Sequence, residues 1–116
     1  MTQTTQPTTE ENKQIIRNFI KDVFDRHDIE AADRYFPENP TQFKQFLSGF
    51  FQRFSDSHTT IDHILAENDK VMVMMTGIGT DNQTGKRVTM KAADLYRIKN
   101  GKIVEHWDVV DASGMA

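Results

Sequence analysis

The sequence predicts an α+β fold in which helices fill the first half of the chain and a curved antiparallel sheet fills the second half. Apolar residues recur at helical spacing in the first half, whereas β-branched residues and alternating patterns dominate the second. The pair Asn100-Gly101 adds the strongest hairpin signal in the chain. Because a long twisted sheet curls, we expect the helices to pack on its concave side and form a cone with an internal pocket.

Two helices are expected before residue 37, where a proline ends the helical pattern. Apolar residues alternate with charged ones at helical spacing over residues 11–26, and Thr8 or Thr9 is expected to cap this helix. A short second helix is expected over residues 29–36, where the Asp28 carboxylate can cap the first turn.

A third helix is expected over residues 41–54. One broad apolar stripe follows its length, formed by Phe43, Phe46, Leu47, Phe50, Phe51 and Phe54. A sheet offers the large surface that such a stripe needs, so core packing is the first interpretation. The alternative is that part of the stripe lines an aromatic pocket, and we select Phe50, together with Phe19 of the first helix, as substrate-binding candidates.

Four strands in two consecutive hairpins are expected over residues 59–66, 70–80, 86–99 and 102–111. In the second expected strand, residues 70–80, apolar side chains occur at both odd and even positions. This predicts a central strand that is covered on both faces. Gly77 and Gly79 in this run are expected to mark a bulge or a bend.

Composition narrows the class of protein. The 116 residues fit one domain, expected over residues 11–111, with a flexible tail at 1–10 and a second tail at 112–116. The chain has no cysteine, which excludes thiolate chemistry and fits a cytoplasmic protein. With a net charge of −3 and no basic run, nucleic acid is not an expected partner. Neither a signal peptide nor an apolar run of about 20 residues is recognised, so no membrane is expected either. No metal-ligand spacing or phosphate loop is recognised, and we expect no metal and no cofactor.

The last expected strand carries the most informative polar residues. Alternation places His106 and Asp108 on one face, with valines on either side. If this face is the concave one, the two groups share a half-buried pocket, where a carboxylate can act as a general acid or base near neutral pH. The alternative is that they pair on an open sheet surface and leave Trp107 in the core.

Asp94 on the neighbouring strand is a conditional partner of Asp108. A regular two-residue turn at Asn100-Gly101 would pair Asp94 with Trp107 and put the two carboxylates on opposite faces. A bulge would bring them to the same face. An unpaired aspartate between Ala93 and Leu95 would be costly to bury, so we expect Tyr96 to accompany it in a pocket.

His63 and Trp107 complete the set of substrate-binding candidates, with Tyr96, Phe19 and Phe50. His63 alternates with Ile61 and Leu65, so it is expected on the apolar face of its strand. A core histidine with satisfied hydrogen bonds is the first interpretation of His63, and a substrate contact is the second.

Several segments of the chain resemble one protein family. They are residues 12–19, 23–30, 64–71, 85–88 and, above all, 96–111, which contain the motif His-Trp-Asp. These segments resemble the SnoaL-like polyketide cyclases of the nuclear transport factor 2-like superfamily. Two stretches depart from the family pattern: residues 34–40 are short and lack a histidine, and residues 80–86 form a short loop.

The resemblance implies an α+β cone around a deep pocket, and often a homodimer through the outer sheet face. It also implies a cofactor-independent lyase or isomerase reaction on a carbonyl compound, such as an aldol-type cyclisation, with an acidic residue as general acid or base. Asp108, the aspartate of the motif, is expected to carry this role, beside His106 and with Asp94 as the third catalytic candidate. The alternative is a non-catalytic module that binds a small apolar ligand or dimerises on the same fold.

Overall fold

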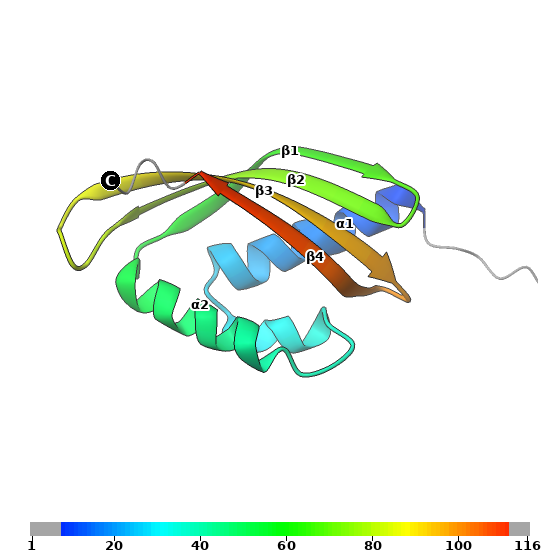
Figure 1. The fold of residues 1–116 in the computed structure, drawn as a ribbon, viewed down its shortest axis with the longest axis horizontal. Coiled ribbons are helices and arrows are strands. Elements are labelled where there is room, and N and C mark those ends of the chain that lie inside the picture. Colours follow the sequence, from blue (N-terminus) through cyan, green and yellow to red (C-terminus); the bar gives the residue numbers. More distant parts are fainter. Residues whose placement is uncertain (1–7, 112–116) are drawn as a thin grey trace, which may run out of the picture.

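The computed structural model describes residues 8–111. It confirms the predicted fold class, because helices precede a four-stranded antiparallel sheet with strand order β1-β2-β3-β4 (Figure 1). The helical elements are α1 (Thr9–Phe19), a π-helical turn η1 (Ile20–Asp25), a 3₁₀ segment η2 (Ile29–Arg34) and α2 (Thr41–Arg53). The strands are β1 (His58–Glu67), β2 (Lys70–Thr80), β3 (Arg87–Lys99) and β4 (Lys102–Asp111).

The first helix begins earlier than the sequence pattern indicated. Thr8 caps α1 through a capping box: its hydroxyl accepts from the Glu11 amide at 3.0 Å, and the Glu11 carboxylate accepts from the Thr8 amide at 3.2 Å. Thr9 and Glu10 therefore belong to α1 and not to a tail. The remaining predicted tails, residues 1–7 and 112–116, lie outside the described residues.

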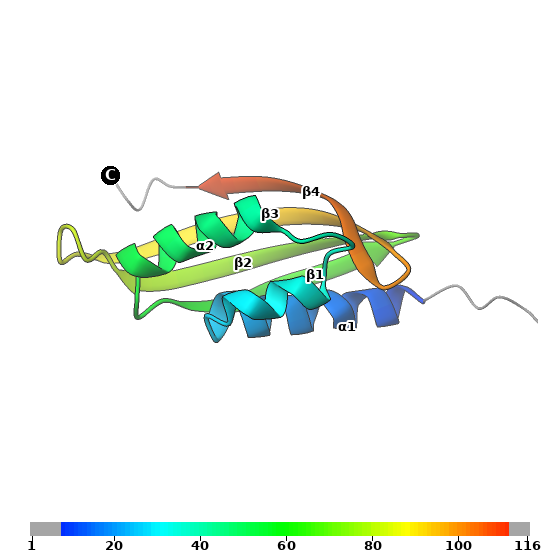
Figure 2. The same cartoon turned by 90° about the horizontal axis from the view of Figure 1, so that it is seen from below.

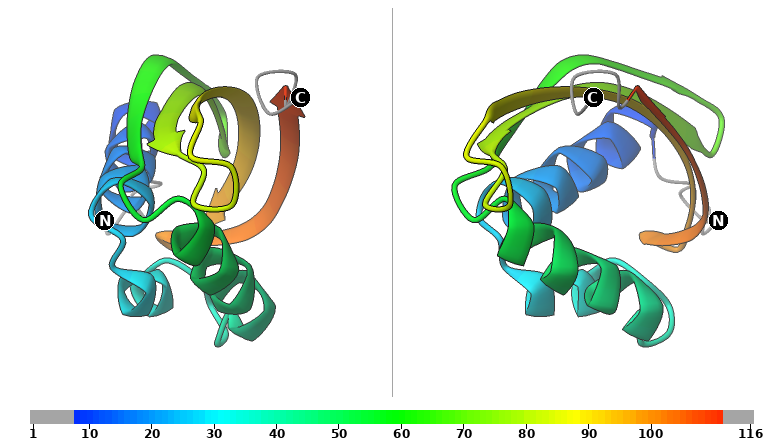
Figure 3. Two further views of the ribbon diagram at one scale, coloured as in Figure 1. Left: turned by 90° about the vertical axis from the view of Figure 1, so that its left-hand side faces the viewer. Right: turned by 60° about the vertical axis from the view of Figure 1, so that its left-hand side comes forward.

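The helices cover the concave face of the sheet (Figures 1 and 2). Seen along the sheet, the strands arch over α1 and α2, and β4 curls furthest around them (Figure 3). The core joins the buried face of α1 and η1 to the inward residues of β2 and β3, with Ile16, Phe19, Val71, Val73 and Ile98 among its members. No helix within residues 8–111 is long and apolar enough to cross a lipid bilayer.

Two β-bulges lie on the outer strands of the sheet, and none lies at Gly77 and Gly79, where a bulge or a bend was expected. The register between β2 and β3 runs without a shift past Gly77 and Gly79. Asp62 in β1 and Val104 in β4 have no partner in otherwise continuous ladders. Each extra residue reverses the faces of all residues beyond it, so these two positions decide which side chains point inward.

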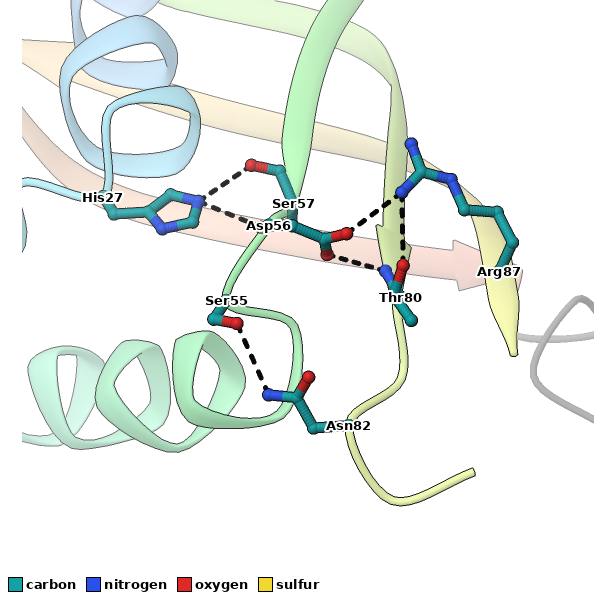
Figure 4. Close-up of polar contacts among 7 residues, drawn as sticks. All are labelled: His27, Ser55, Asp56, Ser57, Thr80, Asn82 and Arg87. Atoms are coloured by element: carbon teal, nitrogen blue, oxygen red, sulfur yellow. Dashed lines mark hydrogen bonds and ion pairs between the residues drawn. The ribbon is translucent and has the colours of Figure 1, made fainter. Parts of the chain in front are cut away.

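Gly79 lies at a close approach between β2 and the segment that leads into β1. A Cβ atom at this position would lie 3.2 Å from the Ser57 Cβ, so a side chain here would require Ser57 to move by a few tenths of an ångström. The same corner holds α2 to the sheet: the Asp56 carboxylate accepts from the Thr80 amide at 2.7 Å and pairs with Arg87 at 3.1 Å (Figure 4). His27 Nε2 lies 2.8 Å from the Ser57 carbonyl oxygen.

The outer face of the sheet carries exposed apolar side chains among charged and polar ones. Met72, Met74 and Ile78 of β2 are exposed, so the prediction that this strand is covered on both faces was wrong. β2 is nevertheless central, with β1 on one side and β3 on the other. Cross-strand pairing aligns an apolar row over the outer face of all four strands: Leu65, Met72, Leu95 and Trp107.

Candidate active site

A cavity of about 450 Å³ lies between the concave face of the sheet and α2. This volume falls in the usual range of small-molecule sites. Most of the wall is apolar and aromatic, with residues from α1, η1, α2, the loop before α2 and all four strands. The aromatic part of the lining comprises Phe19, Phe24, Phe36, Phe43, Phe46 and Phe50.

The bulge at Val104 brings the polar part of the lining together. The hairpin turn has the predicted form, with positive φ at both Asn100 (53°) and Gly101 (74°). Beyond the bulge, Asp94 pairs with Asp108 and Tyr96 pairs with His106. The register expected from a regular two-residue turn therefore holds only up to the pair Ile98–Ile103. From Arg97 back to Lys91 the strands pair as the bulged alternative predicts. All four side chains line the cavity.

Asp94 is the buried acid of the site, with 6% of its surface exposed. Burial, and secondarily the nearby Asp108 carboxylate, raise the pKa of Asp94 from 3.8 to about 7. The Tyr96 hydroxyl donates a hydrogen bond to Asp94 Oδ2 at 2.7 Å, which opposes part of this rise in pKa. The pKa of Tyr96 is itself raised well above 10, first by burial and then by the charge of Asp94. Tyr96 therefore acts as a fixed hydrogen-bond donor at neutral pH.

His106 and Asp108 lie on the open side of the cavity. Their side chains are 38% and 50% exposed, and His106 Nε2 is 3.6 Å from Asp108 Oδ2. The His106 ring stacks on Tyr96 with 6.2 Å between centroids, and the rings of Phe36 and Phe43 lie edge-on to it at 6.4 Å. The site therefore has a buried carboxylate, Asp94, at its inner end, and a solvent-accessible imidazole and carboxylate, His106 and Asp108, at its open side.

The structure brings six of the eight predicted site residues to the cavity: Asp108, His106, Asp94, Tyr96, Phe19 and Phe50. His63 and Trp107 do not line the cavity, and their prediction as substrate contacts is corrected. The bulge at Asp62 turns His63 outward, where it is exposed and not a core residue. The bulge at Val104 turns Trp107 to the outer face, where it is 46% exposed and Arg97 stacks on its ring.

The sequence reasoning missed several wall residues. Phe36 and Phe43 flank His106, and Gln42 extends from the first turn of α2 into the lining. Phe43 belonged to the apolar stripe expected over residues 41–54, but Gln42 and Phe36 lie outside that stripe, so their position in the sequence did not point to the cavity. Within residues 8–111, no three His, Asp or Glu side chains are grouped so as to hold a metal ion.

Fold and cavity together define a class of protein: an α+β cone that encloses an aromatic pocket with one buried carboxylate. The SnoaL-like polyketide cyclase family model matches residues 14–116. The chain therefore belongs to this family. A comparison with curated proteins gave no significant match.

Solved structures share the fold at low sequence identity. AclR, a putative hydroxylase from Streptomyces galilaeus, superposes with a TM-score of 0.84 at 22% identity, covering 93% of this chain and 83% of AclR. A putative polyketide cyclase from Acidithiobacillus ferrooxidans gives a TM-score of 0.78 at 21% identity, covering 96% and 94% of the two chains. TsrD from Streptomyces laurentii gives 0.81 at 20% identity, covering 95% of each.

Proposed function

We propose that the cavity performs cofactor-independent acid–base chemistry on a carbonyl compound, as an aldol-type cyclisation or an isomerisation. The observation that carries this proposal is the opposed pair Asp94 and Asp108, in which Asp94 is buried and has a pKa of about 7. A general base works best when its pKa lies near the ambient pH, because it is then both available and strong enough. The proposal places the reaction in the cytoplasm, since the chain has no cysteine.

The proposed reaction begins at a carbon next to the carbonyl group. Asp94 takes a proton from this carbon, and the electrons of the broken C–H bond form an enolate. In an aldol step the enolate carbon attacks a second carbonyl of the same molecule, forming a C–C bond, and the new alkoxide takes a proton back from Asp94. In an isomerisation the proton returns to a different carbon. In both outcomes the burial of Asp94 limits the access of water to the base.

Burial favours Asp94 over Asp108 as the base, although the sequence motif had pointed to Asp108. Asp108 and His106 are accessible to solvent, so in this proposal His106 donates a hydrogen bond to the enolate oxygen and Asp108 orients the imidazole. Tyr96 positions the Asp94 carboxylate through its 2.7 Å hydrogen bond.

Deuterium exchange of a bicyclic aromatic ketone, α-tetralone, tests the chemistry without knowledge of the natural substrate. The protein should speed exchange of the α-protons with D₂O, and Asp94→Asn should lower the rate about a hundredfold. Asp33→Asn removes the same charge from an exposed helical position outside the cavity and should leave the rate unchanged. Equal rates for the protein and Asp94→Asn would leave a non-catalytic ligand-binding module as the better account.

We also propose that a second copy of the chain covers the outer sheet face. The apolar row over the four strands supports this, because Leu65 and Trp107 at its ends are 69% and 46% exposed. A sheet face with such a continuous apolar surface is unusual for a monomer in water.

A further inference from the structure

Asp94 differs from most other aspartates of the chain in its partners. Lysine or arginine nitrogens lie within ion-pair distance of Asp22, Asp33, Asp56, Asp62, Asp69 and Asp81. Asp94 is more deeply buried than most of these, yet within the described part of the chain its partners are the Tyr96 hydroxyl and the neighbouring Asp108. A buried carboxylate is normally paired with a positive charge, so this one has room for a cationic partner.

Among residues 8–111, the rest of the cavity wall supplies no positive charge from a lysine or arginine. Three titratable groups of this part of the chain face Asp94: Tyr96 on its own strand, and His106 and Asp108 on β4. The lining residues of α1, η1, α2, β1 and β2 and of the loop before α2 are uncharged; they are phenylalanines together with Gln42, Thr59, Met75 and Gly77. A ligand in this cavity therefore meets two carboxylates and no lysine or arginine.

The aromatic wall suits a cation as well as an apolar body. Phenylalanine and tyrosine rings carry negative charge on their faces, which attracts ammonium groups in desolvated sites. An ammonium group has three N–H donors, and a carboxylate has more acceptor positions than the single bond from Tyr96 uses. We propose that the cavity binds a protonated aromatic amine, with its ring among the phenylalanines and its ammonium group between Asp94 and Asp108.

This inference concerns binding, and it goes beyond the proposed reaction. It stands whether or not the cavity is catalytic. An amine that holds Asp94 in its ionised form would also compete with a carbonyl compound for the same carboxylate. Carboxylates and phosphates should be rejected, because like charges across a desolvated site repel each other.

The pH dependence of binding follows from linkage between the amine and the Asp94 proton. Below about pH 7 Asp94 carries a proton in the free protein, which must leave when an ammonium group binds. Affinity for the amine should therefore rise with pH up to about 7 and level off above it. A neutral ligand of the same shape displaces no proton and should not show this rise.

Calorimetric titration of three matched probes tests the inference: naphthylmethylamine, naphthylmethanol and naphthoate. At about pH 8 the amine should bind about tenfold more tightly than the alcohol, and naphthoate should bind most weakly. Asp94→Asn should abolish the preference for the amine but keep the affinity for the alcohol, which shows that the cavity remains folded. Asp33→Asn, which lies outside the cavity, should keep both the preference for the amine and the rise of amine affinity with pH.

Equal affinities of the amine and the alcohol would overturn the inference, and so would an amine preference that survives in Asp94→Asn. The outcome is separate from that of the proposed reaction. Ketone exchange that depends on Asp94, without selective amine binding, would refute only the inference. Selective amine binding without ketone exchange would refute only the reaction.

Discussion

Asp94 on β3 and Asp108 on β4 occupy directly opposite positions of an antiparallel ladder, and both side chains line the same cavity. The extra residue Val104 in β4 creates this relationship, because a regular ladder would pair Asp94 with Trp107. The two carboxylates differ in exposure, since Asp94 is buried and Asp108 is half exposed. Their proximity and this difference in burial give the pair one member with a pKa near neutrality.

Tyr96→Phe should move the pH profile of ketone exchange to higher pH. The Tyr96 hydroxyl stabilises the ionised form of Asp94, so its loss should raise the pKa of Asp94 above about 7. We expect the midpoint of the exchange rate against pH to rise by up to about one pH unit. Tyr35→Phe is the matched control, because Tyr35 donates to Asp22 at the same 2.7 Å outside the cavity. An unchanged midpoint in Tyr96→Phe would show that this hydrogen bond does not control the base.

The free energy of unfolding should fall as the pH rises from about 4 to about 7. Asp94 has a pKa of about 7 in the folded chain against 3.8 for an ordinary aspartate, so the folded state binds more protons than the unfolded state in this window. Stability is then lost as the proton leaves. Between pH 5 and pH 8 we expect Asp94 to contribute a loss of about 1 to 3 kcal/mol, and Asp94→Asn should remove this contribution. Urea unfolding at several pH values measures it; an identical pH dependence in both proteins would contradict the prediction.

Two glycine substitutions should have opposite effects on stability. Gly79→Ala places a Cβ atom 3.2 Å from the Ser57 Cβ and 3.3 Å from its Cα, and we expect a loss of about 1 to 3 kcal/mol. Gly49→Ala, in the interior of α2, meets no atom within 4 Å and should stabilise the chain by about 0.5 to 1 kcal/mol. Thermal and urea denaturation compare the two variants. A neutral Gly79→Ala would mean that β1 and β2 separate at this corner at little cost.

Most secondary-structure elements could be predicted from the sequence. The spacing of apolar residues located the helices, and Asn100-Gly101 fixed the last turn together with the bounds of β4. Residue type also indicated that Thr8 or Thr9 caps α1, and the structure shows that Thr8 is the cap.

The sequence did not predict to which face of the sheet each side chain of the outer strands β1 and β4 points. A bulge adds one residue without a distinctive composition, as Asp62 and Val104 illustrate, and every later side chain then changes face. His63 and Trp107 were misplaced for this reason. The burial of Asp94 likewise depends on contacts between segments far apart in the sequence, such as that of Phe19 in α1 with Tyr96 in β3, which no local pattern reports.

Met72→Lys should separate the proposed homodimer. Met72 lies in the middle of the apolar row on the outer face, so a charge there would have to be buried between the two copies. Light scattering after size exclusion should give a dimer for the unmodified chain and a monomer for Met72→Lys, with unchanged circular dichroism. Gln45→Lys, on the exposed side of α2, adds the same charge and should remain a dimer. A monomeric unmodified chain would refute this assembly.

A carbon-13 NMR titration of the Asp94 side-chain carboxyl, assigned by its loss in Asp94→Asn, tests directly whether the cavity holds a base with a pKa near neutrality. We expect a midpoint at about pH 7, because burial and Asp108 raise the pKa of Asp94. The midpoint should fall in Asp108→Asn, since that variant removes the neighbouring negative charge. A midpoint close to the ordinary value of 3.8 would contradict the account, because Asp94 would then be a permanently ionised group and a weak base at neutral pH.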